Sequence, residues 1–241
     1  MGKHKMSNAK EVVLVISDTH APFHHKDTLR FLEAVKKKYK PTRVVHIGDM
    51  TDSYHLSDYI KDPDGISAKE EIAGMHKFVN SLVKMFPKMH ILIGNHDTRL
   101  YRQAQKVGIP LHYLKDYHSW MNCPKQCTIS DSIEIDGILY THGDEQGAGG
   151  DNAAIKRAKA NFQSTVSGHL HTKADIRFFA NRKCLVFGMQ TGCLIDHEKY
   201  AFAYSKKQLI KPIISCGVVD KGIPTVVPMF LDANGTWIGS L

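Results

Sequence analysis

Aspartate, asparagine and histidine recur in this sequence directly after short apolar segments that have the length of a β-strand. Five such segments occur, at residues 12–16, 44–47, 90–93, 138–141 and 165–167. The polar residues that follow them are Asp18, His20, Asp49, Asn95, His142, His169 and His171. Oxygen and imidazole ligands without thiolates suit Mn²⁺, Fe, Zn²⁺ or Ni²⁺. We therefore predict a site for two divalent metal ions, with Mn²⁺ as the first choice.

Two ions held by this set would make a hydrolytic site for phosphate esters. A carboxylate such as Asp49 can bridge ions about 3.5–4 Å apart, and such a pair clamps a phosphate and converts a bound water into a hydroxide at neutral pH. His96, which follows Asn95, could donate a proton to the leaving oxygen or stabilise charge. Taken singly, Asp18 or Asp49 could equally cap a helix, so the prediction depends on the whole set.

The elements around these residues predict how they meet. Near-continuous apolar runs are typical of strands buried on both faces. Helices are expected over 29–39 after Asp27, after the capping-box pair Ser67 and Glu70, and from Asp151 to about Gln163. Strands that alternate with helices predict an α/β fold with a largely parallel sheet. Loops at the carboxyl ends of such strands gather in one crevice, which would bring the polar residues together.

The C-terminal part has a different pattern. From residue 183 onward the sequence contains short apolar runs with turn signals, and Asn234-Gly235 predicts a hairpin between 226–231 and 236–238. This pattern indicates a second layer rich in antiparallel strands. We expect residues 11–241 to form one domain after a flexible tail at 1–10, because a chain of 241 residues can bury one substantial core.

Five motifs occur in a fixed order along the chain. They are Asp18 and His20 separated by one residue, Gly48-Asp49, Gly94-Asn95-His96-Asp97, His142-Gly143 and Gly168-His169-Leu170-His171. The ordered set resembles the calcineurin-like metallophosphoesterase superfamily over residues 18–171. The resemblance implies a four-layer αββα sandwich. It also implies that Asp18, His20 and His171 hold one ion, that Asn95, His142 and His169 hold the other, that Asp49 bridges them and that His96 is catalytic.

Asp52 occupies a position with a further implied role. Phosphoprotein phosphatases of this superfamily carry there a second aspartate that orients the catalytic histidine. In those phosphatases Arg-Gly follows, whereas this chain has Ser53-Tyr54. The resemblance therefore implies a catalytic role for Asp52, and the departure counts against a phosphoprotein phosphatase.

Several neighbouring residues are candidates for contacts with substrate. Arg99 and Arg102 could grip a phosphate from the start of a helix, or could lie on an exposed helix face. Asn95 is a further candidate beside its predicted metal. His24 and His25 could line the mouth of the site, although an exposed loop is the favoured interpretation. Glycines at 147–150 could bring N–H groups to a phosphate or form a lid, and an ordinary connection is favoured.

Composition restricts the class of protein. The chain has 42% hydrophobic and 23% charged residues, as in folded globular proteins, and no apolar run of the length that crosses a bilayer. The N-terminus lacks the apolar stretch of a secretory signal and the five cysteines are scattered, so we expect a cytoplasmic protein without disulfides. The net charge of +8 would attract a polyanion such as DNA or RNA.

These observations predict a metal-dependent phosphoesterase. The first hypothesis is a phosphodiesterase, such as a nuclease, that hydrolyses nucleic acid or a nucleotide derivative. The alternative is a phosphomonoesterase that acts on nucleoside monophosphates or another small ester, since surrounding loops choose the substrate. A third possibility is an inactive binding scaffold, but such a protein would be expected to have lost ligands, and all seven are present. The loops at 53–66, 101–128 and 145–152 are expected to select the substrate.

Overall fold

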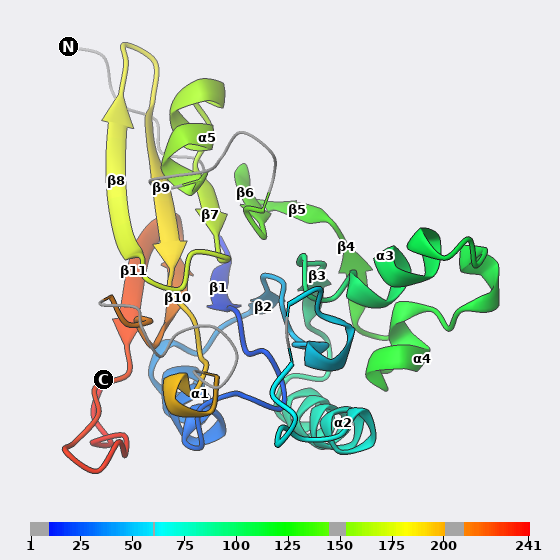
Figure 1. Cartoon of the computed structure of the whole chain (residues 1–241). Helices are drawn as coiled ribbons and strands as arrows, with labels where there is room; N and C mark the ends of the chain where they lie inside the picture. The colour runs from blue at the N-terminus through cyan, green and yellow to red at the C-terminus, as the bar shows by residue number, and fades with distance from the viewer. Residues whose placement is uncertain (1–9, 60, 145–152, 201–209) are drawn as a thin grey trace.

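The computed structural model describes residues 10–59, 61–144, 153–200 and 210–241. Within them, two β-sheets lie face to face and helices cover the outer face of each sheet (Figure 1). The six-stranded sheet has the order β11-β10-β1-β2-β3-β4, and the five-stranded sheet has the order β5-β6-β7-β9-β8. This arrangement confirms the predicted four-layer αββα sandwich.

The first sheet is parallel from β1 to β4 and antiparallel at the β10–β11 edge, whereas the second has a parallel centre and two antiparallel edges. The first contains β1 (Val12–Ile16), β2 (Arg43–His46), β3 (His90–Leu92), β4 (Thr128–Ser130), β10 (Ser215–Asp220) and β11 (Ile223–Pro228). The second contains β5 (Ser132–Ile135), β6 (Ile138–Thr141), β7 (Thr165–Ser167), β8 (Ala174–Ala180) and β9 (Leu185–Thr191). The helices are α1 (Thr28–Tyr39), α2 (Ala68–Met85), α3 (Arg99–Lys106), α4 (Tyr117–Met121), α5 (Ala153–Asn161) and α6 (His197–Tyr200), with 3-10 turns η1 (Tyr54–Leu56) and η2 (Leu111–Tyr113).

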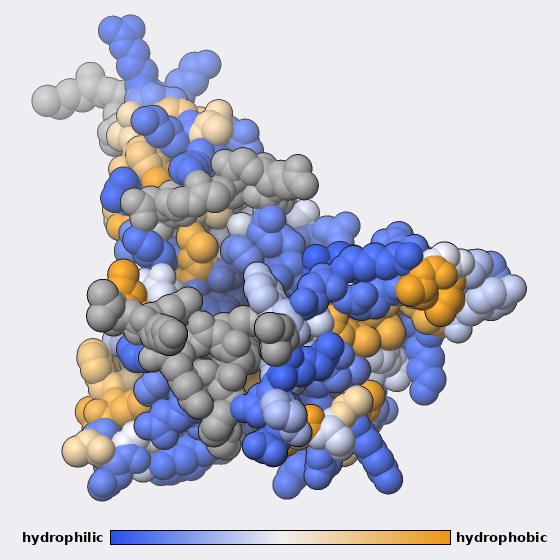
Figure 2. Space-filling model, viewed as in Figure 1, coloured by the Kyte–Doolittle hydropathy of each residue, from blue (hydrophilic) through white to orange (hydrophobic). Residues whose placement is uncertain are grey.

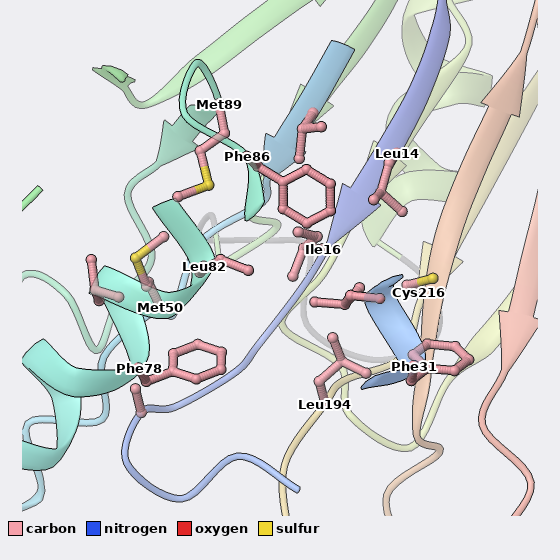
Figure 3. Close-up of a cluster of buried hydrophobic side chains, with 14 of the residues drawn as sticks. Leu14, Ile16, Phe31, Met50, Phe78, Leu82, Phe86, Met89, Leu194 and Cys216 are labelled. Atoms are coloured by element: carbon pink, nitrogen blue, oxygen red, sulfur yellow. The ribbon is translucent and has the colours of Figure 1, made fainter. Parts of the chain in front are cut away.

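Strand β1 lies at the centre of the core and is buried on both faces. Val13 and Val15 belong to the apolar cluster between the two sheets, whereas Leu14 and Ile16 belong to the cluster beneath α1 and α2. Figure 3 shows Leu14 and Ile16 in the same layer as Leu82 of α2. Alternate side chains of a strand point to opposite faces, so one continuous apolar run supplies both layers.

Helix α5 covers the outer face of the second sheet and packs on β7 and β9. The close approach requires a glycine in β9, because a Cβ on Gly188 would lie 2.6 Å from the Cα of Ile155. Asp151, the predicted cap of this helix, lies outside the described residues, as do the glycines at 147–150. None of the helices in the described ranges has the length and hydropathy needed to cross a membrane.

The predicted helix starts differ in how they are stabilised. Ser67 and Glu70 form the expected capping box, in which the Glu70 N–H donates to the Ser67 hydroxyl at 3.3 Å and the Ser67 N–H donates to the Glu70 carboxylate at 2.9 Å. Asp27 precedes α1 but makes no side-chain capping bond. Its carboxylate instead accepts from the Trp237 N–H at 3.0 Å and so ties the C-terminal segment to α1.

The prediction of a separate C-terminal layer is wrong, although β10 and β11 pair antiparallel as expected. Strand β9 joins the second sheet beside β7, while β10 and β11 extend the first sheet next to β1. The second sheet therefore begins at β5, and two of the five strands that lead to predicted ligands, β6 and β7, belong to it. The segment at 223–228 pairs with β10, so the hairpin at Asn234-Gly235 is reduced to a single bridge between Leu231 and Trp237. Apolar runs do not specify which strands pair, because paired strands are in contact with each other although they are far apart in the sequence.

Candidate metal centre

All seven predicted metal ligands lie in one cluster where the carboxyl ends of β1, β2, β3, β6 and β7 meet. Ligand atoms of Asp18, His20, Asp49 and His171 all lie within 4.8 Å of one another, and so do those of Asp49, His142 and His169. The Asn95 Oδ1 atom lies 3.1 Å from the His142 Nε2 atom. Asp49 belongs to both groups, which is the arrangement required of a bridging carboxylate.

Tight turns after the strands aim these side chains inward. Asp18, His20, Asp49 and His169 have positive φ angles of 47°, 43°, 49° and 69°, a left-handed conformation that is unfavourable for residues other than glycine. Backbone bonds hold the first two turns together, since the His20 N–H donates to the Asp49 carbonyl at 3.0 Å. The local strain is thus offset by hydrogen bonds between loops that follow neighbouring strands.

Asp49 is 1% exposed, and its carboxylate faces imidazoles from both sheets. Its Oδ2 atom lies 3.6 Å from the Nε2 atom of His20 and 3.2 Å from that of His142, and its Oδ1 atom accepts from the His96 N–H at 2.8 Å. Burial alone would raise the pKa of Asp49, but the His142 and His96 imidazoles hold it well below its ordinary value. The group is therefore a carboxylate rather than a carboxylic acid.

The imidazoles direct their Nε2 atoms toward the carboxylates. The Nδ1 atom of His20 bonds to Asp52 at 2.8 Å, and that of His142 bonds to the Ile47 carbonyl at 3.1 Å. These bonds fix the rings and leave the Nε2 atoms available as ligands. Burial, with a contribution from His96, lowers the pKa of His20 to about 4, so this ring is neutral.

The donors fit divalent cations. The Nε2 atoms of His20 and His171 lie only 3.1 Å apart, close to the carboxylates of Asp18 and Asp49. Burial opposes a charge on His142, but the Asp49 carboxylate outweighs it and raises the pKa of His142 to about 10. A cation beside Asp49 would replace the proton that this carboxylate otherwise stabilises on the imidazole. Neutral imidazoles, carboxylates and an amide oxygen form the donor set that transition-metal ions prefer.

Asp52 links a predicted metal ligand to the predicted catalytic histidine. Its Oδ1 atom accepts from the Nδ1 atoms of both His20, at 2.8 Å, and His96, at 2.9 Å. Burial would raise the pKa of Asp52, but these two bonds lower it below its ordinary value. Burial also disfavours a charge on His96, but Asp49 and Asp52 outweigh it and raise the pKa of His96. One carboxylate oxygen thus sets the orientation of both rings.

Arg99 lies inside the site and is 7% exposed, so the exposed-face interpretation is wrong for this residue. Its guanidinium donates to the Nε2 atom of His96 at 3.1 Å and to the Asp52 carbonyl at 2.9 Å. Arg102 is exposed and donates to the Asn95 carbonyl at 2.9 Å. Arg99 is three residues after His96, and its N–H donates to the His96 carbonyl at 3.1 Å, so the turn before α3 brings the two residues together.

His24 and His25 belong to none of the groups of described side chains that could hold an ion. The ring of His24 stacks on Phe78 of α2 with centroids 3.8 Å apart. His25 is 4% exposed, and its Nε2 atom lies 3.2 Å from the Gly235 carbonyl. The exposed-loop interpretation is wrong for His25, because the segment packs beneath the C-terminal turn.

The family model for calcineurin-like phosphoesterases matches residues 12–179 of this sequence. The chain belongs to this family. It is therefore a metal-dependent hydrolase of phosphoric esters, and the family implies divalent ions at the cluster of aspartates and histidines. No curated protein matches the sequence.

Several solved structures align with most of this phosphoesterase at low sequence identity. Yfce, a phosphoesterase from E. coli, is 13% identical over 94% of this chain and 96% of its own, with a TM-score of 0.49. Vps29 from Chaetomium thermophilum is 14% identical over 95% and 93%, with a TM-score of 0.48. A putative diadenosine tetraphosphatase is 15% identical over 94% and 97%, with a TM-score of 0.43. The family assignment rests on the sequence match.

Asp97 is a structural residue of the phosphoesterase site. It belongs to the third motif, but the sequence alone assigned it no role. Its fully buried carboxylate accepts from the Thr51 N–H and hydroxyl, both at 3.0 Å, and from the Gly94 N–H at 2.9 Å. The bonds from Thr51 connect the loop after β2 to the loop after β3, and the bond from Gly94 closes the turn within the second of these loops. Burial, reinforced by the charge of Asp49, raises the pKa of Asp97 to about 6.

Three motif glycines pack directly against predicted ligands. A Cβ on Gly94 would overlap with the carboxylate of Asp49, and one on Gly168 would overlap with that of Asp18. A Cβ on Gly48 would lie 2.5 Å from the Nδ1 atom of His142. The glycines are therefore required for close packing around the carboxylates.

Gly94→Ala should displace the Asp49 carboxylate and reduce the manganese content of the purified phosphoesterase by at least about half, as measured by inductively coupled plasma mass spectrometry. Gly137→Ala is the matched control, because Gly137 has a φ of +77° but no atom within 4 Å of its Cβ position. The control should cost about 1–2 kcal/mol of stability through backbone strain and keep its metal. Equal metal content in the two variants would contradict the packing argument.

Asp52→Asn should weaken Mn²⁺ binding by about 10–100-fold, because the neutral amide no longer holds the His20 ring with a charged acceptor. It should also lower kcat at saturating Mn²⁺ through His96. Metal titration and steady-state kinetics measure the two effects separately. Asp220→Asn, at an exposed position at the end of β10, is the control and should change neither. If Asp52→Asn left both quantities unchanged, the orienting role would be refuted.

Proposed function

We propose that this protein is a phosphodiesterase that hydrolyses nucleic acid or a nucleotide derivative at a centre of two divalent ions, with Mn²⁺ as the first choice. The observation that carries the proposal is the position of Asp49 in two groups of ligand atoms, with His96 beside them. Asp18, His20 and His171 would hold one ion, Asn95, His142 and His169 the other, and Asp49 would bridge them.

The chain's own residues supply the proton transfer and the orientation. Two ions, when bound, would neutralise the phosphate and lower the pKa of the attacking water. The His96 Nε2 atom would deliver a proton to the leaving oxygen, while Asp52 holds the opposite side of the ring at 2.9 Å. Arg99 now donates to that Nε2 atom at 3.1 Å. While it accepts this bond, Nε2 carries no proton. A phosphate oxygen is a stronger acceptor for a guanidinium, so substrate binding would draw Arg99 away, and Nε2 would take up a proton from water and pass it to the leaving oxygen.

The alternative is a phosphomonoesterase acting on nucleoside monophosphates or another small ester. The same ligands would serve it, since the metal centre handles the phosphate and the surrounding residues choose the attached group. The net charge of +8 favours a polyanionic substrate and hence the diester. An inactive scaffold is disfavoured, because all seven predicted ligands are present and gathered in one cluster.

A substrate panel with Mn²⁺ separates these functions. We expect hydrolysis of bis-p-nitrophenyl phosphate and of at least one natural diester among single-stranded DNA, double-stranded DNA and cyclic nucleotides. p-Nitrophenyl phosphate should be a poorer substrate. Initial rates of product release provide the measurement. Turnover of monoesters alone would exclude the diesterase, and the absence of any Mn²⁺-dependent turnover would favour the scaffold.

Two substitutions separate catalysis from metal binding. His96→Ala should reduce kcat by about 10²–10⁴-fold and keep the bound metal, because His96 acts as an acid rather than as a ligand. Asp49→Ala should reduce both turnover and metal content. Steady-state kinetics and elemental analysis of the same preparations provide the readout. Asp220→Ala, at an exposed aspartate at the end of β10, is the control and should match the wild-type protein. A wild-type rate in either site variant would refute the assignment.

A further inference from the structure

A pocket of about 260 Å³ opens beside the predicted metal centre. One wall is α3, with Arg99, Arg102 and Gln103, and the other is the segment that follows η1, with Asp58 and Tyr59. Figure 2 shows the surface over α3 as largely hydrophilic. We call this space the α3 pocket.

The α3 pocket begins at the atoms proposed to act on the leaving oxygen. Asn95, a predicted metal ligand, and Arg99 both line it. The guanidinium of Arg99 lies 3.1 Å from the His96 Nε2 atom, which would protonate that oxygen. A group attached to the leaving oxygen therefore has the α3 pocket directly in front of it. The pocket is on the leaving-group side of the reaction.

The walls of the α3 pocket are braced against each other. The Gln103 amide donates to the Leu56 carbonyl and to the Asp58 carboxylate, both at 2.8 Å. The Lys106 ammonium pairs with the same carboxylate at 2.6 Å. The buried Glu71 of α2 accepts from the first N–H of η1 at 2.6 Å. Such preformed walls lower the entropy lost when a ligand binds.

The chemistry of the α3 pocket changes from one end to the other. Next to the metal centre, Arg99 and Arg102 provide positive charge, which favours phosphate. Asp58 provides a carboxylate that can accept from an N–H or O–H donor. Tyr59 is 66% exposed and offers an aromatic face. Phosphate, hydrogen-bond donors and a flat ring are combined in a nucleotide, and aromatic side chains commonly stack on bases.

We propose that the α3 pocket binds a single nucleoside of the leaving group, so that the favoured substrates are esters with one nucleoside or nucleotide on that side. A volume of about 260 Å³ accommodates one such unit but not a stretch of duplex. This inference rests on the proposed function. In the reaction, a water molecule loses one proton to solvent and its oxygen forms the new bond to phosphorus. The bond from phosphorus to the nucleoside oxygen breaks, its electron pair stays on that oxygen, and the oxygen takes a proton from His96.

Calorimetry on the Mn²⁺-loaded protein tests the proposal with two stable probes. One is the AMP analogue in which a methylene group replaces the 5′ oxygen, and the other is methylphosphonate, which lacks the nucleoside. We expect the nucleotide analogue to bind at least about tenfold more tightly. Tyr59→Ala and Arg102→Gln should each reduce this preference severalfold. Phe230→Ala and Arg182→Gln are controls at an exposed aromatic residue and an exposed arginine outside the α3 pocket and should keep it.

Equal affinity for the two probes, or an unchanged preference in both pocket variants, would overturn the proposal. The failure of this proposal can be distinguished from the failure of the proposed function. Preference for the nucleotide analogue without turnover of any diester would support the α3 pocket and refute the diesterase. Turnover of diesters without that preference would support the diesterase and refute the α3 pocket.

Discussion

Three aspartates, Asp18, Asp49 and Asp52, lie together in the site and are each at most 1% exposed. The local structure depends on the burial of their carboxylates. Ionised carboxylates are stable away from water only when hydrogen-bond donors or cations surround them. Backbone N–H groups supply part of this compensation, since His169 donates to Asp18 at 3.0 Å and His96 to Asp49 at 2.8 Å. We propose that two divalent ions supply the rest, because imidazoles from both sheets point at the same carboxylates.

This requirement explains features of the backbone that are otherwise costly. Glycines stand where a Cβ would overlap with Asp18 or Asp49, and four predicted ligands adopt left-handed conformations that pack their side chains inward. The two-sheet sandwich is the framework for these turns, because β1, β2 and β3 deliver ligands from one sheet and β6 and β7 from the other. Hydrogen bonds between loops, such as those that the Asp97 carboxylate accepts from Thr51, keep the turns in place.

The ligand cluster could be predicted from sequence because each part of it is local. An apolar strand followed by a polar turn is visible in the residues, and the shared carboxyl end brings the turns together. The division of the strands between two sheets could not be predicted, since pairing depends on contacts far apart in sequence. The same limit applies to His24, which stacks on Phe78, and to the Asp52 oxygen that serves both His20 and His96. Side-chain direction at a turn is set by the neighbours it packs against.

The most direct test of the buried two-metal centre is the metal content of the wild-type protein purified with Mn²⁺, measured together with its melting temperature before and after chelation. The account predicts two ions per chain and a melting temperature that falls by several degrees when the ions are removed, because binding to the folded state stabilises it. Fewer than one ion per chain, with the same melting temperature in Mn²⁺ and in chelator, would contradict it.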